Sequence, residues 1–350
     1  MSDTPHDHPP TARRVVACVT EAEDEGERAD VVLGRRIPGL SRRQARALAR
    51  TSRLRIDGHR RPPSTRVTPG QRLELELDGP EAAGGVAPVD VEALAITDQF
   101  VYVYKPAGIH TVALTPEQPG VLATAVARRW PECASASEDP REGGAVHRLD
   151  QPTSGVVAFA RSREAWAAAR AGFGAERVAK HYLAACERQT SSWPPPLPEG
   201  GLAGWLVPTD DPTGYEAELD AVIGATGLTA QPTVRIRAAI GRDGGPERSA
   251  VRLDGRRAST VVRPLAAAGD RLLVRLLLET GRRHQARVHL AWVGLPIVDD
   301  PVYGVAPTDP DHPAIHLHAF AIDLSDVVPG EAPVYAPPPP GFWPPGSTPG

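Results

Sequence analysis

The sequence contains almost no lysine, few cysteines and no long apolar run. Of its 39 basic side chains, only Lys105 and Lys180 are lysines. The three cysteines, Cys18, Cys133 and Cys186, lie far apart and form no C-x-x-C pair, which argues against a disulfide framework or a zinc ribbon. No apolar run reaches the roughly 18 residues that span a bilayer, and the N-terminus lacks an apolar signal region. We therefore expect a soluble, cytoplasmic protein with no membrane partner.

The charge of the chain is unevenly distributed. The net charge is −4, in a chain with 41% hydrophobic and 23% charged residues that can bury a core. Residues 35–72 nevertheless hold twelve arginines and one acid, whereas residues 21–30 are strongly acidic. A basic segment of this kind is typical of surfaces that bind nucleic-acid phosphates, and a solvated arginine-rich face is the alternative interpretation.

The basic segment also carries signals for local structure. Ser41 can cap a helix over residues 42–50 that has a thin apolar stripe. Residues 54–58 predict a short strand with a turn, and residues 71–77 predict a second strand with alternating leucines. This order resembles the small RNA-binding domain named after ribosomal small-subunit protein four. The resemblance implies an RNA-binding domain over residues 24–78, in which five arginines contact RNA: Arg42, Arg43, Arg46, Arg53 and Arg55.

Two other segments concentrate side chains that can carry chemistry. Residues 147–155, HRLDQPTSG, hold Asp150 before a turn that leads into an apolar stretch. Active-site groups are often presented where a loop becomes a strand. Residues 280–289, TGRRHQARVH, follow an apolar strand over residues 272–278 and crowd arginine and histidine together. Such a cluster suits an anionic ligand and could keep a nearby carboxylate ionised.

These segments resemble the motifs of the RluA-type pseudouridine synthases. HRLDQPTSG is similar to the catalytic motif of that family, and residues 280–304 are similar to its late motif. Lys-Pro-Ala-Gly at 105–108 and Lys-His-Tyr at 180–182 resemble two shorter motifs in the expected order. The resemblance implies an α+β fold. Its catalytic domain would have a mixed, mostly antiparallel central sheet, and a small N-terminal α/β RNA-binding domain would precede it.

The resemblance also implies a reaction, the isomerisation of specific uridines to pseudouridine in RNA, with ribosomal RNA ahead of transfer RNA. This reaction needs neither a cofactor nor a metal. Asp150 matches the catalytic aspartate of the family and would act as a nucleophile or as a base, and the sequence leaves both roles open. Arg287 is expected to pair with Asp150 through a bidentate contact, and Tyr182 to stack on the uracil and take part in proton removal. Arg148 is expected to fill the gap left by a flipped base. Further RNA contacts are expected from Lys105, Arg282 and His284.

The predicted organisation of the chain has six parts. They are a disordered N-terminus (1–23), the RNA-binding domain (24–78), a linker (79–88), the catalytic domain (89–328), an atypical insertion within it (191–232) and a proline-rich tail (329–350). Strands are expected at 89–96 and 100–104, and helices at 121–130 and 163–173. The expected partner is RNA, and we expect a monomer with no obligate protein partner.

Two alternatives compete with this interpretation. The first is a non-catalytic RNA-binding or RNA-folding protein on the same scaffold, but the presence of Asp150, Tyr182 and Arg287 together favours the enzyme. The second is a metal-dependent nuclease, for which the sequence offers no ligand cluster. Four histidines lack H-E-x-x-H or Cys/His spacing and are expected to be structural or to contact RNA: His284, His289, His316 and His318.

Overall fold

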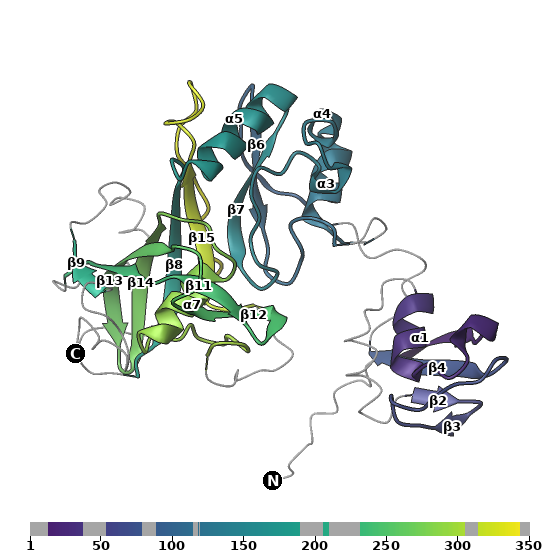
Figure 1. Cartoon of the computed structure of the whole chain (residues 1–350). Coiled ribbons are helices and arrows are strands. Elements are labelled where there is room, and N and C mark those ends of the chain that lie inside the picture. The colour runs from purple at the N-terminus through teal and green to yellow at the C-terminus, as the bar shows by residue number, and fades with distance from the viewer. Residues whose placement is uncertain are drawn as a thin grey trace, which may run out of the picture. The chain divides into compact units, whose positions relative to one another are not determined.

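The computed structural model describes residues 13–37, 54–78, 89–114, 118, 120–189, 206–209, 232–304 and 314–343. The chain divides into two compact units, Met1–Pro88 and Val89–Gly350 (Figure 1). Each unit has its own apolar core. The helix expected at 42–50 and the linker at 79–88 lie outside the described residues. So do four of the arginines expected to contact RNA: Arg42, Arg43, Arg46 and Arg53. In the part of the chain that is described, no helix is long and apolar enough to cross a bilayer.

The described part of the N-terminal unit is a four-stranded antiparallel sheet against which a helix packs. Its strands lie in the order β1-β4-β2-β3, with bounds Arg13–Val19, Arg72–Asp78, Leu54–Ile56 and His59–Arg60. Helix α1, Ala29–Arg36, follows a 3-10 turn at Ala22–Asp24 and buries Leu33 against Leu73 and Leu75 of β4. The strands expected at 54–58 and 71–77 are confirmed. The prediction of disorder over residues 1–23 is wrong from residue 13 onward, because β1 pairs with β4 along its whole length.

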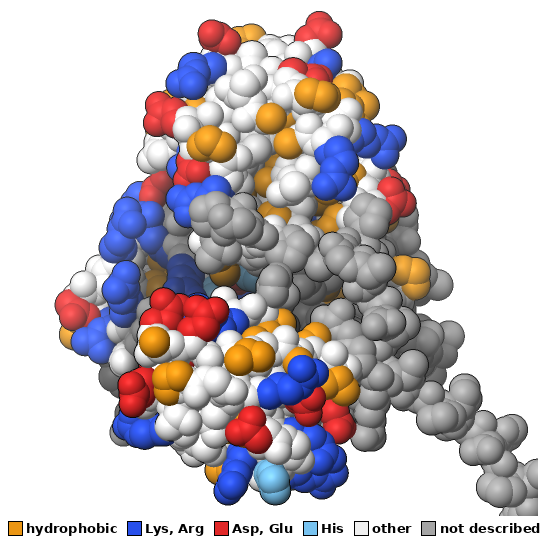
Figure 2. All heavy atoms as spheres, turned by 90° about the vertical axis from the view of Figure 1, so that its right-hand side faces the viewer, with side chains coloured by type: hydrophobic (Ala, Val, Ile, Leu, Met, Phe, Trp, Pro, Cys, Tyr) orange, Lys and Arg blue, Asp and Glu red, His pale blue; other side chains and the backbone are white. Residues whose placement is uncertain are grey.

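The acidic segment of this unit is paired with its neighbouring arginines. Asp24 is completely buried and forms ion pairs with Arg35 and, at 2.7 Å, with Arg36. Burial opposes the negative charge, but hydrogen bonds from a backbone amide and from both arginines lower the pKa of Asp24. In contrast, Arg60 and Arg61 beside β3 are exposed and form no ion pair with a described residue. Figure 2 shows basic and acidic side chains interspersed on the face that it draws.

The C-terminal unit is built on a ten-stranded sheet among the described residues. Its order is β5-β6-β7-β15-β8-β14-β13-β10-β9, and β16 pairs separately with β15. In chain order β5 to β10 are Ala93–Ile96, Phe100–Lys105, Ser154–Ala160, Ala179–Glu187, Leu206–Pro208 and Val234–Arg237. Strands β13 to β16 are Ser259–Ala268, Arg271–Leu278, Leu317–Asp323 and Val334–Tyr335. Among the described strands of this sheet, only the β7–β15 pair is parallel, so the predicted mixed, mostly antiparallel sheet is confirmed.

Helices pack on both faces of this sheet (Figure 1). On one face lie α3, Leu122–Arg129, and α7, Gln285–Trp292, while α5, Arg163–Gly174, lies on the other. The short helix α4, Pro131–Ala134, and a 3-10 turn at Pro140–Glu142 follow α3. Strands β11, Ile240–Asp243, and β12, Gly245–Val251, form a separate hairpin that packs beside α7. Tyr182 of β8 packs against the clusters of both α3 and α7 and therefore lies between those helices.

Two segments differ from the sequence-based expectation. Within the insertion at 191–232, the described residues include β9, which pairs with β10 at the end of the sheet. The proline-rich tail packs on the domain through its described residues, 329–343, because β16 pairs with β15 and Phe342 is buried against Phe320. The high proline content of this segment predicted a loosely attached tail. Its few aromatic side chains nevertheless bury enough apolar surface to hold the segment against the domain.

Gly155 permits the parallel pairing of β7 with β15 directly after the Asp150 turn. Its φ is +125°, a backbone conformation open to glycine and rarely to other residues. A Cβ atom at this position would lie 2.2 Å from the backbone oxygen of Ala319 in β15. The glycine in the HRLDQPTSG segment therefore sets how closely the site loop approaches the centre of the sheet.

We predict that Gly155→Ala destabilises the protein, because both the close approach and the positive φ are lost. The expected loss in free energy of unfolding is about 3 kcal/mol, a fall in Tm of roughly 6 to 12 °C. Gly174→Ala, at the end of α5, is the matched control, since no atom lies within 4 Å of its added Cβ and it carries no positive φ. Thermal denaturation of both variants tests this, and similar Tm values for Gly155→Ala and wild type would contradict it.

Candidate active site

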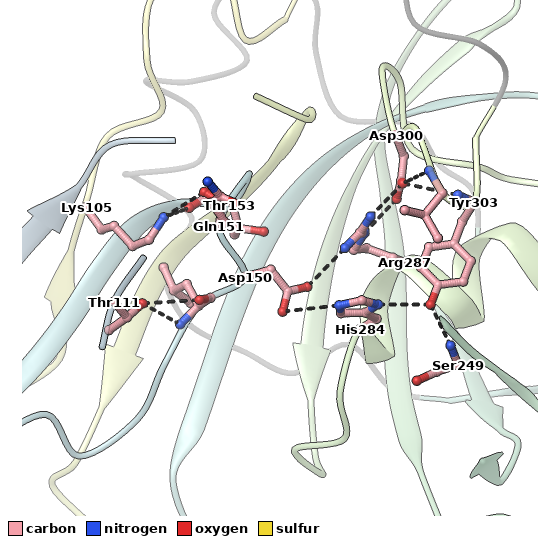
Figure 3. Close-up of polar contacts among 12 residues, drawn as sticks. Lys105, Thr111, Asp150, Gln151, Thr153, Ser249, His284, Arg287, Asp300 and Tyr303 are labelled. Atoms are coloured by element: carbon pink, nitrogen blue, oxygen red, sulfur yellow. Dashed lines mark hydrogen bonds and ion pairs between the residues drawn. The ribbon is translucent and has the colours of Figure 1, made fainter. Parts of the chain in front are cut away.

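The backbone around Asp150 is held by a reciprocal contact from Thr111 (Figure 3). The Thr111 hydroxyl donates to the carbonyl oxygen of Leu149 at 3.2 Å and accepts from its amide at 3.1 Å. The amide of Thr153 donates to the carbonyl oxygen of Asp150 at 3.1 Å and closes the following turn. These contacts fix the loop from which the Asp150 side chain, 28% exposed, projects.

Lys105 lies beneath the same loop and is completely buried. Its Nζ donates to the carbonyl oxygens of Pro106 at 3.1 Å, Gln151 at 3.1 Å and Thr153 at 2.7 Å, which uses the three donors of an ammonium group. Burial lowers the pKa of Lys105 to about 7, against the opposing effect of the Asp150 charge. The prediction that Lys105 contacts RNA is therefore wrong for this structure, because its ammonium holds the backbone of the site loop.

Arg287 projects from α7 and has a different main partner from the one predicted. Its Nε and Nη2 atoms each lie 2.7 Å from a carboxylate oxygen of Asp300, and both side chains are buried. Asp300 also accepts hydrogen bonds from the amides of Val302 at 2.9 Å and Tyr303 at 3.1 Å. Burial opposes the positive charge, but the hydrogen bonds and charge of Asp300 raise the pKa of Arg287. The bidentate contact expected with Asp150 is therefore made with Asp300.

Asp150 receives one longer contact on each of its carboxylate oxygens. Arg287 Nη1 lies 3.4 Å from Oδ2, and His284 Nε2 lies 3.8 Å from Oδ1 (Figure 3). The structure thus brings Arg287 and Asp150 together, but through a single contact. A fixed guanidinium places a positive charge beside the carboxylate, while the length of both contacts leaves the carboxylate free to turn toward a ligand.

Tyr182 lies near this carboxylate. Burial, with the added negative charge of Asp150, raises the pKa of Tyr182, so the phenol keeps its proton at neutral pH. Its partly exposed ring, between the α3 and α7 clusters, suits stacking on a flat ligand. Tyr182 was also expected to take part in proton removal from the uracil. To act as a base, its phenol would first have to lose its own proton, and burial opposes that loss.

The remaining residues expected to bind RNA lie in different places. Arg148 is exposed directly beside Asp150. The Arg282 side chain is largely occupied, because Nε donates to the carbonyl oxygen of Arg257 at 2.8 Å and Nη2 contacts Glu176 at 3.2 Å. Arg55 belongs to the N-terminal unit, where it donates to the carbonyl oxygen of Gly58, and its side chain is 38% exposed. His284 lies in the site itself, beside the Asp150 carboxylate.

Two of the histidines considered as metal ligands have structural partners on both ring nitrogens. His289 lies 2.9 Å from the Thr260 hydroxyl and 2.8 Å from the carbonyl oxygen of Ala238. His318 lies 2.9 Å from both the Ser154 hydroxyl and the carbonyl oxygen of Ala336. Burial lowers the pKa of each to about 4, so both imidazoles are neutral at neutral pH. Among the described residues, no group of three or more His, Cys, Asp or Glu side chains could hold a metal ion.

Sequence reasoning did not identify Thr111, Asp300 and Tyr303 as structural parts of this site. Asp300 and Tyr303 do carry a local signal, because an aspartate followed two and three residues later by free amides commonly accepts hydrogen bonds from them. Thr111 carries no such signal. Its contact with Leu149 joins two loops that are distant in sequence and are brought together only by β6 and β7.

Comparison with known proteins shows the family to which the chain belongs. A family model described as RNA pseudouridylate synthase matches residues 99–292, more than half of the chain. An uncharacterized RNA pseudouridine synthase of Chloroflexus aurantiacus is 33% identical over 280 residues, which cover 79% of this chain and 75% of that protein. The ribosomal large subunit pseudouridine synthase D of Pseudomonas aeruginosa is 30% identical over 281 residues, covering 80% and 74% respectively.

A solved structure, the human RNA pseudouridylate synthase domain containing 1, aligns with a TM-score of 0.48 at 21% identity and covers 75% of this chain and 88% of that one. The family match spans the Asp150 loop, β8 and α7, which together form the site described above. The protein is an isomerase that acts on RNA. The chain belongs to the RNA pseudouridylate synthase family, as its motifs had indicated.

We predict that Lys105→Met slows catalysis without weakening RNA binding. Methionine keeps much of the length of the side chain but removes the donors that hold the carbonyl oxygens of Gln151 and Thr153. A small displacement of the Asp150 loop should lower the single-turnover rate constant about 10- to 100-fold, while the Kd for RNA stays within about twofold. Filter binding and single-turnover assays separate the two effects. An unchanged rate constant combined with weaker binding would instead restore the RNA-contact role.

Proposed function

We propose that this protein converts specific uridines of ribosomal RNA to pseudouridine, with Asp150 as the catalytic carboxylate. The observation that carries the proposal is the arrangement of Asp150, which is partly exposed in front of a buried guanidinium anchored elsewhere. Ribosomal RNA is favoured because the relative from Pseudomonas aeruginosa is named for the large ribosomal subunit.

The reaction sets three demands that this site can meet. The bond from the sugar to the uracil nitrogen must break, the uracil must rotate while bound, and its 5-carbon must join the sugar and lose its hydrogen as a proton. In one route an oxygen of Asp150 attacks the sugar carbon as the bond to the uracil nitrogen breaks, and in the other Asp150 removes a proton from the sugar. Arg287 places its positive charge beside Asp150 in either route, and the Tyr182 ring holds the uracil by stacking. Arg148, exposed beside Asp150, fills the gap that the flipped base leaves.

An arginine-lined pocket of about 980 Å³ supports RNA binding at a second place on the catalytic unit. Its charged lining residues are Glu176, Arg177, Arg235, Arg237, Arg257 and Glu279. Both acids are already matched, because Glu176 contacts Arg257 and Arg282, and Glu279 contacts Arg235 at 3.0 Å. The remaining charge is positive and suits the phosphates of RNA that flanks the target uridine.

Two arginines that line the pocket project from the face of β10 opposite to α7. In β10, Arg235 and Arg237 alternate with Val234 and Ile236, which belong to the same apolar cluster as α7. Arg237 is exposed and forms no ion pair with a described residue, so its charge is available to a ligand. In our proposal the N-terminal unit, as a ribosomal-protein-S4-like domain, adds further contacts with RNA phosphates.

We predict that Asp150→Ala and Asp150→Asn both abolish tritium release from ribosomal RNA labelled at the uracil 5-position and transcribed without modifications. RNA binding should stay within a few fold, because the carboxylate acts on the reacting nucleotide and phosphate contacts lie elsewhere. The control is Asp254→Asn, since Asp254 is an exposed aspartate whose partner is Arg252. Turnover like that of wild type in either Asp150 variant would exclude the assignment. If the wild type released tritium from transfer RNA but not from ribosomal RNA, the proposed substrate would change and the assignment of Asp150 would stand.

We predict that Arg237→Ala weakens RNA binding more than Arg242→Ala, an exposed arginine of the β11–β12 hairpin. If Arg237 contacts a phosphate, the plot of log binding constant against log salt concentration should be less steep by about one for Arg237→Ala than for the wild type. Binding titrations from about 50 to 200 mM salt measure this slope. Identical slopes for both variants and wild type would show that the pocket does not contact RNA.

A further inference from the structure

His284 is held between Asp150 and Tyr303 at the start of α7 (Figure 3). Its φ of 56° places the residue in the left-handed region, and its side chain is 11% exposed. The Nδ1 atom lies 2.9 Å from the Tyr303 hydroxyl, and Nε2 lies 3.8 Å from Oδ1 of Asp150. The strained backbone thus turns one ring nitrogen toward each of two polar groups.

The hydrogen bonds of Tyr303 determine which ring nitrogen of His284 carries the proton. The amide of Ser249, in β12, lies 2.9 Å from the Tyr303 oxygen and can only donate to it. The hydroxyl proton is then free for the neighbouring acceptor, which is Nδ1 of His284. A neutral imidazole that accepts at Nδ1 carries its own proton on Nε2, the nitrogen that faces Asp150. The opposite tautomer would direct a lone pair at the carboxylate.

We propose that His284 is a positioning residue for Asp150, kept in the Nε2–H tautomer by the chain from Ser249 through Tyr303. The proposal rests on the role of Asp150 proposed above. Arg287 faces Oδ2 at 3.4 Å and His284 faces Oδ1 at 3.8 Å, so each oxygen of the carboxylate has one such group directed at it. The site therefore combines one permanent cation with one neutral donor.

The surroundings of His284 and Tyr303 keep this chain in place. Burial lowers the pKa of His284, and the nearby charges of Arg287 and Arg283 act in the same direction, so the imidazole is neutral at neutral pH despite Asp150. The guanidinium of Arg287 lies 5.0 Å from the centre of the Tyr303 ring, which holds the ring by a cation–π contact. The backbone amide of Tyr303 also bonds to Asp300, the partner of Arg287. One buried aspartate therefore holds both Arg287, which reaches Asp150, and Tyr303, which contacts His284.

The test is a double-mutant cycle between Tyr303→Phe and His284→Gln. Phenylalanine keeps the ring but removes the hydroxyl that selects the tautomer, and glutamine provides an amide donor that has no tautomers. Tyr303→Phe should lower kcat about tenfold in the wild-type background, with the KM for RNA unchanged. It should have almost no further effect on kcat in the His284→Gln background. Equal losses in both backgrounds would overturn the proposal.

Two comparisons separate positioning from a merely structural role. His284→Leu bears the same unfavourable backbone geometry as His284→Gln but has no donor, so the glutamine variant should keep at least about fivefold more activity if the donor matters. Equal activities of these two variants would also overturn the proposal. Tyr102→Phe is the matched control, because it loses a buried hydroxyl contact with Glu331 at 2.7 Å, and its kcat should not change.

Failure of the proposed function gives a different result. If Asp150→Asn turned over RNA like the wild type, the role of Asp150 itself would fall. If Asp150→Asn is inactive and the double-mutant cycle shows no coupling, only the role of His284 is excluded. Circular dichroism and Tm of each variant show whether a fall in kcat follows from lost folding.

Discussion

The buried ion pair between Arg287 and Asp300 is the interaction on which the site depends. Two charges removed from water are tolerated only where hydrogen bonds satisfy them, and loss of one partner typically costs about 3 to 5 kcal/mol. Asp300 meets this condition with two contacts from Arg287 and two backbone amides. Since one of those amides belongs to Tyr303, the same carboxylate orders both the guanidinium and the ring beside His284.

The opposite side of the site is ordered by backbone contacts. Lys105 at the end of β6 and Thr111 in the following loop hold the chain on both sides of Asp150, and Gly155 lets that chain enter the sheet beside β15. Among the described residues, the Asp150 carboxylate makes only long contacts. Rigid surroundings around a loosely held carboxylate would suit the role proposed for Asp150, because the cost of ordering the loop is met when the protein folds.

The positive charge that the surface offers to a ligand depends on which arginines form ion pairs within the protein, not on how many arginines the sequence contains. The arginines between residues 35 and 72 form a strongly basic segment in the sequence, but Arg35 and Arg36 are matched by Asp24 and its neighbours. Within the described residues, exposed arginines without such partners include Arg60, Arg61 and Arg237. These side chains can bind RNA phosphates and release their counterions without first breaking an ion pair with a described residue of the protein.

The sequence by itself determined the family, the mixed sheet and the identity of Asp150, Tyr182 and Arg287 as neighbours, because these follow from short motifs and from the family that those motifs resemble. Tertiary structure decided which aspartate Arg287 binds, that Lys105 is buried, and that the proline-rich segment joins the sheet. Each of these depends on contacts between segments far apart in the chain. A local pattern lists the groups that could pair, whereas the distances that select among them exist only after the sheet has formed.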